Sequence, residues 1–230
     1  LPVPEKLDAQ DKSPESCEFL VTVQKNYFDE MFDFMRKTGI RIPINGTNWQ
    51  TTFGTMTSIA NSDFADGHHY FYDFLLWKEF VKTNDNRSIM EHRSIFTNIS
   101  QTLEGKPFFM SEWDLPWPNE HRAECPVYLA ALGGLQDWNG FAIHTYSYLA
   151  RPDLLKMVGM ESSSAAIAGS PYRQGVFNTF NDPAKFGLFY VAALMTRRGD
   201  VKPSETIYAL DATSPELYNK GISEFPDTSP

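Results

Sequence analysis

An alternation of helical and strand-like segments is the feature that most constrains the fold of this 230-residue chain. Apolar residues recur at a helical period in five stretches, residues 17–38, 51–60, 87–103, 122–136 and 184–196. Short apolar runs typical of buried strands lie between these stretches, at residues 40–44, 64–71, 107–110 and 141–146. Helices and strands in this order predict a parallel sheet with helices on its faces.

The polar groups that follow the apolar runs favour one kind of parallel fold. Functional side chains at the C-terminal ends of strands are typical of a barrel and of a doubly wound sheet. No strand is followed by GxGxxG or GxxxxGK[ST], which argues against a nucleotide-binding sheet. We therefore expect an α/β fold of the (β/α)8 TIM-barrel type, of which four strands are half.

The two ends of the chain differ from its centre. Residues 1–16 are polar and contain proline, as expected of a leader or loop, and they lack the basic and apolar segments of a signal peptide. Residues 205–230 are predicted to be a linker or tail, with a possible short strand at residues 206–210. The predicted domain therefore spans residues 17–204.

The stretch KPFFMSEWDLPWPNE, residues 106–120, contains the leading candidate for chemistry. Its apolar run ends in Ser111-Glu112-Trp113-Asp114, which places the Glu112 carboxylate at the tip of a buried strand. Burying a carboxylate without a partner is strongly unfavourable, so this position suggests a functional role. A structural ion pair with an arginine is an equally open interpretation.

The strand predicted at residues 64–71 carries a second set of polar side chains. Asp66, His68 and Tyr70 alternate along it and therefore share one face. His68 and His69 point to opposite faces and cannot easily bind one metal ion, so no metal site is expected here.

Composition excludes several partners. The formal charge of −9 argues against binding to nucleic acid or to an anionic membrane, and no apolar run approaches the roughly 20 residues that span a bilayer. The two cysteines, Cys17 and Cys125, lie in no metal-ligand spacing. We expect free thiols, with a disulfide as the open alternative.

Four short sequences resemble a clan A retaining glycoside hydrolase, most closely the family-five-like bacterial enzymes. They are GTNW at 46–49, DxHxY at 66–70, SEW at 111–113 and QDWNG at 136–140. The resemblance extends over roughly residues 17–203 and includes the closing RRGDVKP. It implies that the chain supplies about strands five to eight of a (β/α)8 barrel, and that the protein is secreted or periplasmic and needs no cofactor.

The resemblance also implies roles for individual residues. Glu112 matches the nucleophile of the family, and Tyr70 matches the tyrosine that hydrogen-bonds the nucleophile. Flat aromatic faces for sugar C–H groups would come from Trp49, Trp113, Trp117 and Tyr146. Hydrogen bonds to sugar hydroxyls would come from Asn48, His68, Asn119 and His144.

The family further requires an acid/base glutamate in an Asn-Glu pair at the end of strand four, and we expect this residue upstream of residue 1. The chain's own pair, Asn119-Glu120, follows no strand, so the role is not assigned to Glu120. The expected partners are a carbohydrate substrate and either the missing N-terminal half-barrel or a second copy of the chain.

Two other functions compete with the hydrolase. A half-barrel has exposed sheet edges and core, so a non-catalytic sugar-binding or scaffold protein that needs a partner chain is the main alternative. A serine hydrolase is disfavoured because the chain has no GxSxG sequence and Ser111 has no evident histidine partner.

Overall fold

The structure is a computed structural model that describes residues 11–49, 52–71, 86–91, 101–116, 119–146, 177, 179 and 182–221. The chain divides into two compact units. The first unit comprises Leu1–His68, Ser94–Phe109 and Glu205–Pro230. The second comprises His69–Arg93 and Met110–Ser204. Residues 75–83 and 161–170 lie outside the described residues. So does most of the helix predicted at 87–103, of which residues 87–91, with the short 3-10 helix η1 (Ile89–Glu91), and residues 101–103 are described.

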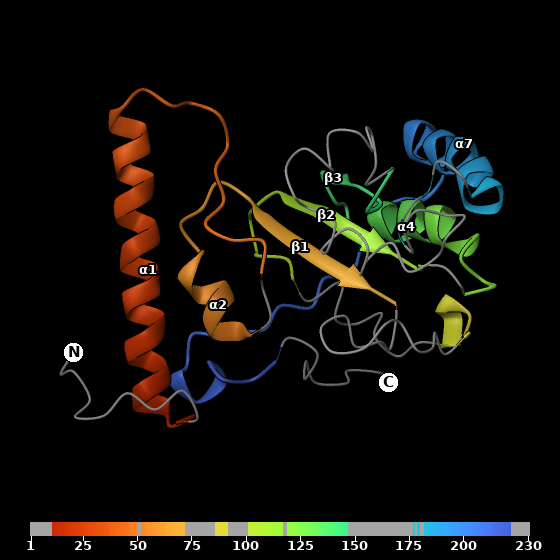
Figure 1. Cartoon of the computed structure of the whole chain (residues 1–230). Coiled ribbons are helices and arrows are strands. Elements are labelled where there is room, and N and C mark those ends of the chain that lie inside the picture. The colour runs from red at the N-terminus through yellow and green to blue at the C-terminus, as the bar shows by residue number, and fades with distance from the viewer. Residues whose placement is uncertain are drawn as a thin grey trace, which may run out of the picture. The chain divides into compact units, whose positions relative to one another are not determined.

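The longest element of the first unit is helix α1, Pro14–Lys37 (Figure 1). The Ser13 side chain accepts a hydrogen bond from the Ser16 amide, and Pro14 occupies the first helical position. Both residues favour the start of a helix at this point of the chain. Gly39 has a φ of 95°, the left-handed conformation typical of a glycine that follows the end of a helix. The helical prediction for residues 17–38 is confirmed.

The core of the first unit lies beneath helix α2, Phe53–Ser58. The Thr52 side chain caps α2 by accepting from the Thr55 amide. Phe53 and Met56 are buried and pack against Leu103, Ala212 and Leu217. Leu217 ends the 3-10 helix η2, Pro215–Leu217. The short strand predicted at residues 206–210 is wrong, because this segment has no regular structure.

Residues 40–44, predicted as the first strand, form none. The reason is visible in their main-chain partners: Arg36 Nη1 donates to the Ile40 and Ile42 carbonyls at 3.0 Å each. The Ile44 amide donates to the Asp63 carboxylate at 2.7 Å. Side chains therefore satisfy main-chain groups that a sheet ladder would otherwise bind, and Ile42 stays 70% exposed.

Three strands form the sheet of the described residues, in the order β1 (Ala65–Tyr70), β2 (Phe108–Asp114) and β3 (Gly140–Phe141). The Phe71 amide donates to the Asp114 carbonyl, and the His144 amide donates to the Trp113 carbonyl. The strands therefore run parallel, with their C-terminal ends at one edge, as the alternation predicts. Strand β3 is shorter than the predicted run at 141–146.

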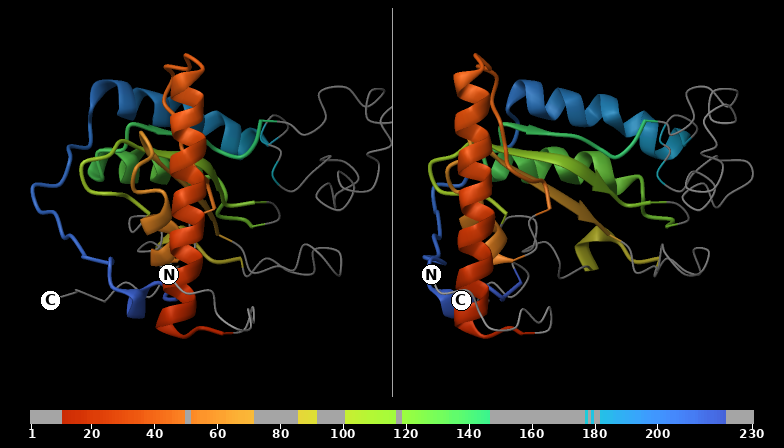
Figure 2. Two further views of the ribbon diagram at one scale, coloured as in Figure 1. Left: turned by 90° about the vertical axis from the view of Figure 1, so that its left-hand side faces the viewer. Right: turned by 60° about the vertical axis from the view of Figure 1, so that its left-hand side comes forward.

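Two helices of the second unit lie side by side, α4 (Glu124–Leu135) and α7 (Pro183–Arg198) (Figures 1 and 2). Asp182 caps α7, and Gly199, with a φ of 62°, ends it. The helices predicted at residues 122–136 and 184–196 are confirmed. No helix in the described part of the chain combines the length and the apolar character needed to cross a bilayer.

The described residues show a mixed α/β chain with a parallel sheet, and the barrel stays a prediction. Cys17 and Cys125 are free thiols, half-buried and buried respectively.

Candidate active site

The centre of the candidate site is a hydrogen bond between neighbouring strands at their C-terminal ends. Tyr70 is the last residue of β1, Glu112 lies near the end of β2, and the Tyr70 hydroxyl donates to Glu112 Oε2. Both side chains are half-buried and belong to the second unit. The phenol therefore holds the carboxylate in a fixed orientation.

An aromatic wall stands beside Tyr70. The His144 ring meets the Tyr70 ring edge-on at 5.9 Å, and the Phe177 ring lies 5.2 Å from Tyr70 and 5.7 Å from His144. The Thr145 amide donates to the Phe177 carbonyl at 3.2 Å, which attaches residue 177 to the segment after β3. Glu112 thus lies next to a cluster that combines apolar ring faces with a titratable imidazole.

Trp113 lies on the face of β2 opposite to Glu112 and is a core residue. It is 0% exposed, and its ring packs 5.0 Å from Phe71, 5.7 Å from Tyr128 and 6.4 Å from Trp138. The predicted role of Trp113 as a sugar platform is wrong in this structure, since a fully buried ring offers no face to a ligand. Trp138 is also buried, and burial raises the pKa of Tyr128 to about 12.

A buried ion pair follows Glu112 on the same strand. Lys185 Nζ, from the first turn of α7, lies 2.8 and 2.9 Å from the two carboxylate oxygens of Asp114, and both side chains are at most 1% exposed. Cys125 Sγ, from the first turn of α4, lies 3.8 Å from Asp114 Oδ1. Desolvation raises the pKa of Asp114 to about 6, although Lys185 opposes the shift, and desolvation also raises the pKa of the Cys125 thiol.

A second ion pair attaches the start of α7 to the approach to α4. Arg122 Nε donates to Asp182 Oδ2, and the Asp182 side chain is 1% exposed. Asp182 also accepts from the Lys185 amide as the cap of α7. The two ion pairs together fix the N-terminus of α7 against the C-terminal end of β2, where Glu112 lies.

Asn119 is also buried in the structure. It is 0% exposed, its Nδ2 donates to the Arg87 carbonyl at 2.9 Å, and its Oδ1 accepts from the His121 amide at 2.7 Å. These bonds give Asn119 a structural role in the turn before α4, so its predicted contact with sugar hydroxyls is wrong in this structure. Glu120 is exposed, and its amide donates to Asn86 Oδ1 at 2.7 Å.

The other predicted binding residues divide between the units. Asn48 and Trp49 belong to the first unit, where Trp49 is 68% exposed. His68 lies two residues before Tyr70 on β1, and its carbonyl accepts from Gln101 Nε2 at 3.1 Å. Tyr146 is 67% exposed, and Trp117 lies outside the described residues. The structure therefore brings Tyr70, Glu112 and His144 together in the second unit.

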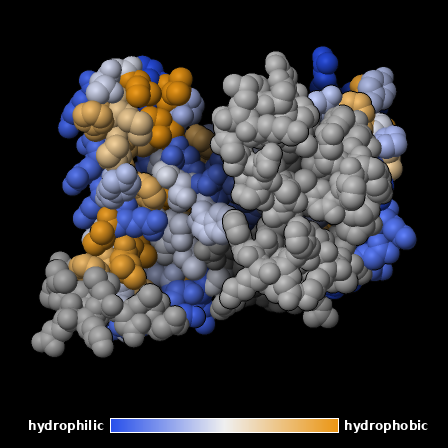
Figure 3. Space-filling view, in the orientation of Figure 1, coloured by the Kyte–Doolittle hydropathy of each residue, from blue (hydrophilic) through white to orange (hydrophobic). Residues whose placement is uncertain are grey.

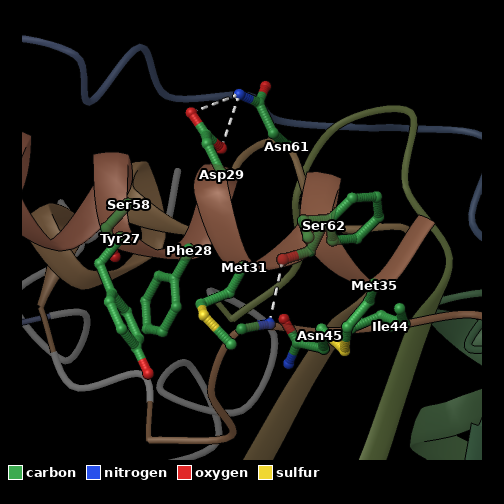
Figure 4. A pocket seen from close by; sticks show the side chains of 12 residues that line it. Tyr27, Phe28, Asp29, Met31, Met35, Ile44, Asn45, Ser58, Asn61 and Ser62 are labelled. Atoms are coloured by element: carbon green, nitrogen blue, oxygen red, sulfur yellow. Dashed lines mark hydrogen bonds between the residues drawn. The ribbon is translucent and has the colours of Figure 1, made fainter. Parts of the chain in front are cut away.

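A cavity of about 180 Å³ lies within the first unit, between α1 and the segments around residues 44–46 and 58–62 (Figure 4). At its edge Asn61 Nδ2 donates to both carboxylate oxygens of Asp29, and the Gly46 amide donates to Ser62 Oγ at 3.1 Å. None of the predicted site residues lines it. The cavity therefore plays no part in the chemistry considered for Glu112.

Several residues around the site were not predicted. Phe177 follows a segment with no strand or helix pattern, so the sequence carried no signal for it. The ion pair between Asp114 and Lys185 has a sequence signal for one partner only. Asp114 lies on the same strand as Glu112, but a lysine in the first turn of a helix normally faces solvent.

Comparisons with protein-family models, with curated proteins and with solved structures found no match to this chain.

Proposed function

We propose that this chain is part of a retaining glycoside hydrolase with a (β/α)8 barrel, in which Glu112 is the nucleophile. The observation that carries the proposal is the hydrogen bond from the Tyr70 hydroxyl to Glu112 Oε2, made between adjacent C-terminal strand ends. Side chains at this edge of a parallel sheet are the ones that perform chemistry in barrel enzymes. The order of the four sequences that carry the resemblance supports the same assignment.

The proposed reaction begins with attack of the ionised Glu112 carboxylate on the anomeric carbon of the sugar. A C–O bond to the carboxylate forms while the glycosidic C–O bond breaks, and the leaving oxygen keeps the bonding electrons. The Tyr70 hydroxyl fixes the carboxylate and stabilises its charge before the attack. Water then cleaves the resulting ester and restores Glu112.

The leaving oxygen also needs a proton. In the proposed enzyme this proton comes from an acid/base glutamate upstream of residue 1, whose carboxyl group would lie about 5–5.5 Å from that of Glu112. Glu120 is a poor substitute, because it lies in the turn before α4 and its amide is bonded to Asn86.

The substrate would be recognised by the aromatic groups beside the nucleophile. Tyr146 and the edge of His144 would contact the sugar, while Phe177 packs against the Tyr70 and His144 rings. An apolar wall with few polar groups is the usual composition of a saccharide site.

A burst experiment tests the proposal with the chain as it stands. Dinitrophenyl glycosides release dinitrophenolate without protonation, so the first chemical step does not require the acid/base residue. We expect one equivalent of dinitrophenolate per chain, lost in Glu112→Gln and kept in the matched variant Glu120→Gln. Sugar binding that is unchanged in Glu112→Gln, with no burst from any glycoside, would instead indicate the non-catalytic sugar-binding alternative.

A further inference from the structure

The cavity of the first unit has the size and the lining of a site for a small aromatic molecule. Its volume is about 180 Å³, and an engineered apolar cavity of about 150 Å³ binds benzene. The apolar part of its lining consists of Tyr27, Phe28, Met31, Phe32, Met35 and Ile44 (Figure 4). Aromatic rings and thioethers pack favourably against a flat ring. In Figure 3 apolar surface, drawn in orange, recurs along α1, which supplies most of these side chains.

One polar atom of the lining lacks a donor. Asn45 Oδ1 is buried and accepts no hydrogen bond within the part of the chain that the structure describes. The orientation of this amide is set by Nδ2, which donates to the Thr47 carbonyl at 2.6 Å, because exchanging its two ends would bring two oxygens together. Leaving a buried acceptor unpaired is unfavourable. A ligand with a hydrogen-bond donor would therefore be stabilised at Asn45.

The other polar side chains of the lining are already hydrogen-bonded. Asn61 Nδ2 donates to both carboxylate oxygens of Asp29, at 3.0 and 3.1 Å. Ser62 Oγ accepts from a main-chain amide at 3.1 Å, and Ser58 Oγ donates to a main-chain carbonyl at 2.6 Å. A buried water needs two to four polar partners, so waters that filled this space would find few. An apolar molecule with a single donor fits the lining better than water does.

The charges of the lining favour a neutral ligand. Among the described residues that line the cavity, Asp29 alone is charged. Its carboxylate is bound by Lys25 Nζ at 2.5 Å and by Asn61. An anion in the cavity would therefore lose its hydration without gaining a cation as partner, which is strongly unfavourable.

We propose that this cavity binds a neutral monocyclic aromatic molecule that donates one hydrogen bond, from O–H or N–H, to Asn45 Oδ1. The ring packs against the side chains of α1 and Ile44. Tyr27 and Met31 are 59% and 39% exposed, so the cavity opens to solvent beside them and a ligand can enter. All the lining residues belong to the first unit, and the proposed ligand is independent of the reaction proposed for Glu112.

Two probes of nearly the same shape, phenol and fluorobenzene, test the proposal by NMR titration of the full chain with labelled methionine and isoleucine methyl groups. We expect phenol to bind saturably with a Kd of about 1 mM or below, and its ring protons to contact the methyl groups of Met31, Met35 and Ile44. Fluorobenzene has no donor and should bind at least about 10-fold more weakly, because it leaves Asn45 Oδ1 unpaired. Asn45→Leu should remove this difference between the probes.

Two tryptophan variants of α1 form a matched pair. Met35→Trp places a larger side chain in the lining and should abolish phenol binding, whereas Phe34→Trp changes a 60% exposed position outside the lining and should leave it intact. The comparison of the two probes needs no variant, so it decides the question even if Met35→Trp does not fold. Absence of saturable phenol binding would show that solvent alone fills the cavity and would overturn the proposal. So would equal affinities for phenol and fluorobenzene, or equal losses in the two tryptophan variants.

Discussion

Replacing Lys185 with methionine should destabilise the second unit strongly. Lys185 and Asp114 are at most 1% exposed and make two contacts of 2.8 and 2.9 Å, so the substitution leaves a carboxylate buried without its cation. Removing one partner of a buried pair costs about 3–5 kcal/mol. With a urea dependence of about 3 kcal/mol per M for a chain of this size, the unfolding midpoint should fall by about 1–1.7 M.

The double variant separates the loss of the pair from the loss of the lysine itself. Asp114→Leu together with Lys185→Met removes both charges, and an apolar pair of similar volume is often as stable as the ion pair. We expect the double variant to unfold within about 1 kcal/mol of the unmodified chain. Urea unfolding followed by tryptophan fluorescence is the measurement, because Trp113 and Trp138 lie in the same unit.

The pair also predicts how this effect varies with pH. Burial raises the pKa of Asp114 to about 6 from an ordinary value of 3.8. The folded chain therefore binds this proton more tightly than the unfolded chain. The contribution of Asp114 to the free energy of unfolding is fully present below about pH 4 and is lost as the pH rises through about 6. Without Lys185 the pKa of Asp114 rises further, and the loss in Lys185→Met should be larger at about pH 8 than at about pH 5. A loss independent of pH, or a single variant within about 0.5 kcal/mol of the unmodified chain, would refute the reasoning.

Three further changes test other parts of the structure. Trp113→Ala should cost about 3–5 kcal/mol in urea unfolding, whereas Trp49→Ala, at a 68% exposed position, should stay within about 0.5 kcal/mol. Asp63→Ala removes bonds to Arg36 and to a main-chain amide, and hydrogen exchange should show faster opening of residues 40–44 with a loss of about 1–3 kcal/mol. Tyr70→Phe should slow the dinitrophenolate burst about 10- to 100-fold, since a hydrogen bond to a charged group contributes about 1.5–3 kcal/mol.

The helices could be predicted from the sequence because their signals are local. Ser13 and Pro14 begin α1, Gly39 follows its end, and Asp182 and Gly199 bracket α7. The apolar run at residues 40–44 looked like a strand for equally local reasons. Its main-chain groups are bonded by Arg36 and Asp63 instead, and that arrangement depends on a side chain 19 residues beyond Ile44.

In the candidate site, too, contacts between residues distant in the sequence could not be predicted from local patterns. The hydrogen bond between Tyr70 and Glu112 was expected and is present. Trp113 was misassigned, although the alternation of side chains along β2 already placed it on the face opposite Glu112. Asn119 was misassigned because its partners, Arg87 and the turn before α4, come together only in the folded chain.

The central claim is that the Glu112 carboxylate forms a bond to a sugar. The most direct measurement is mass spectrometry of the chain after incubation with dinitrophenyl 2-deoxy-2-fluoroglycosides, whose fluorine slows hydrolysis of the glycosyl ester by destabilising its oxocarbenium-like transition state. The proposed function predicts that one fluorosugar is added per chain, that fragmentation places it on Glu112, and that Glu112→Gln stays unlabelled while Glu120→Gln is labelled. A label on another residue, or a chain that no such glycoside labels, would contradict it.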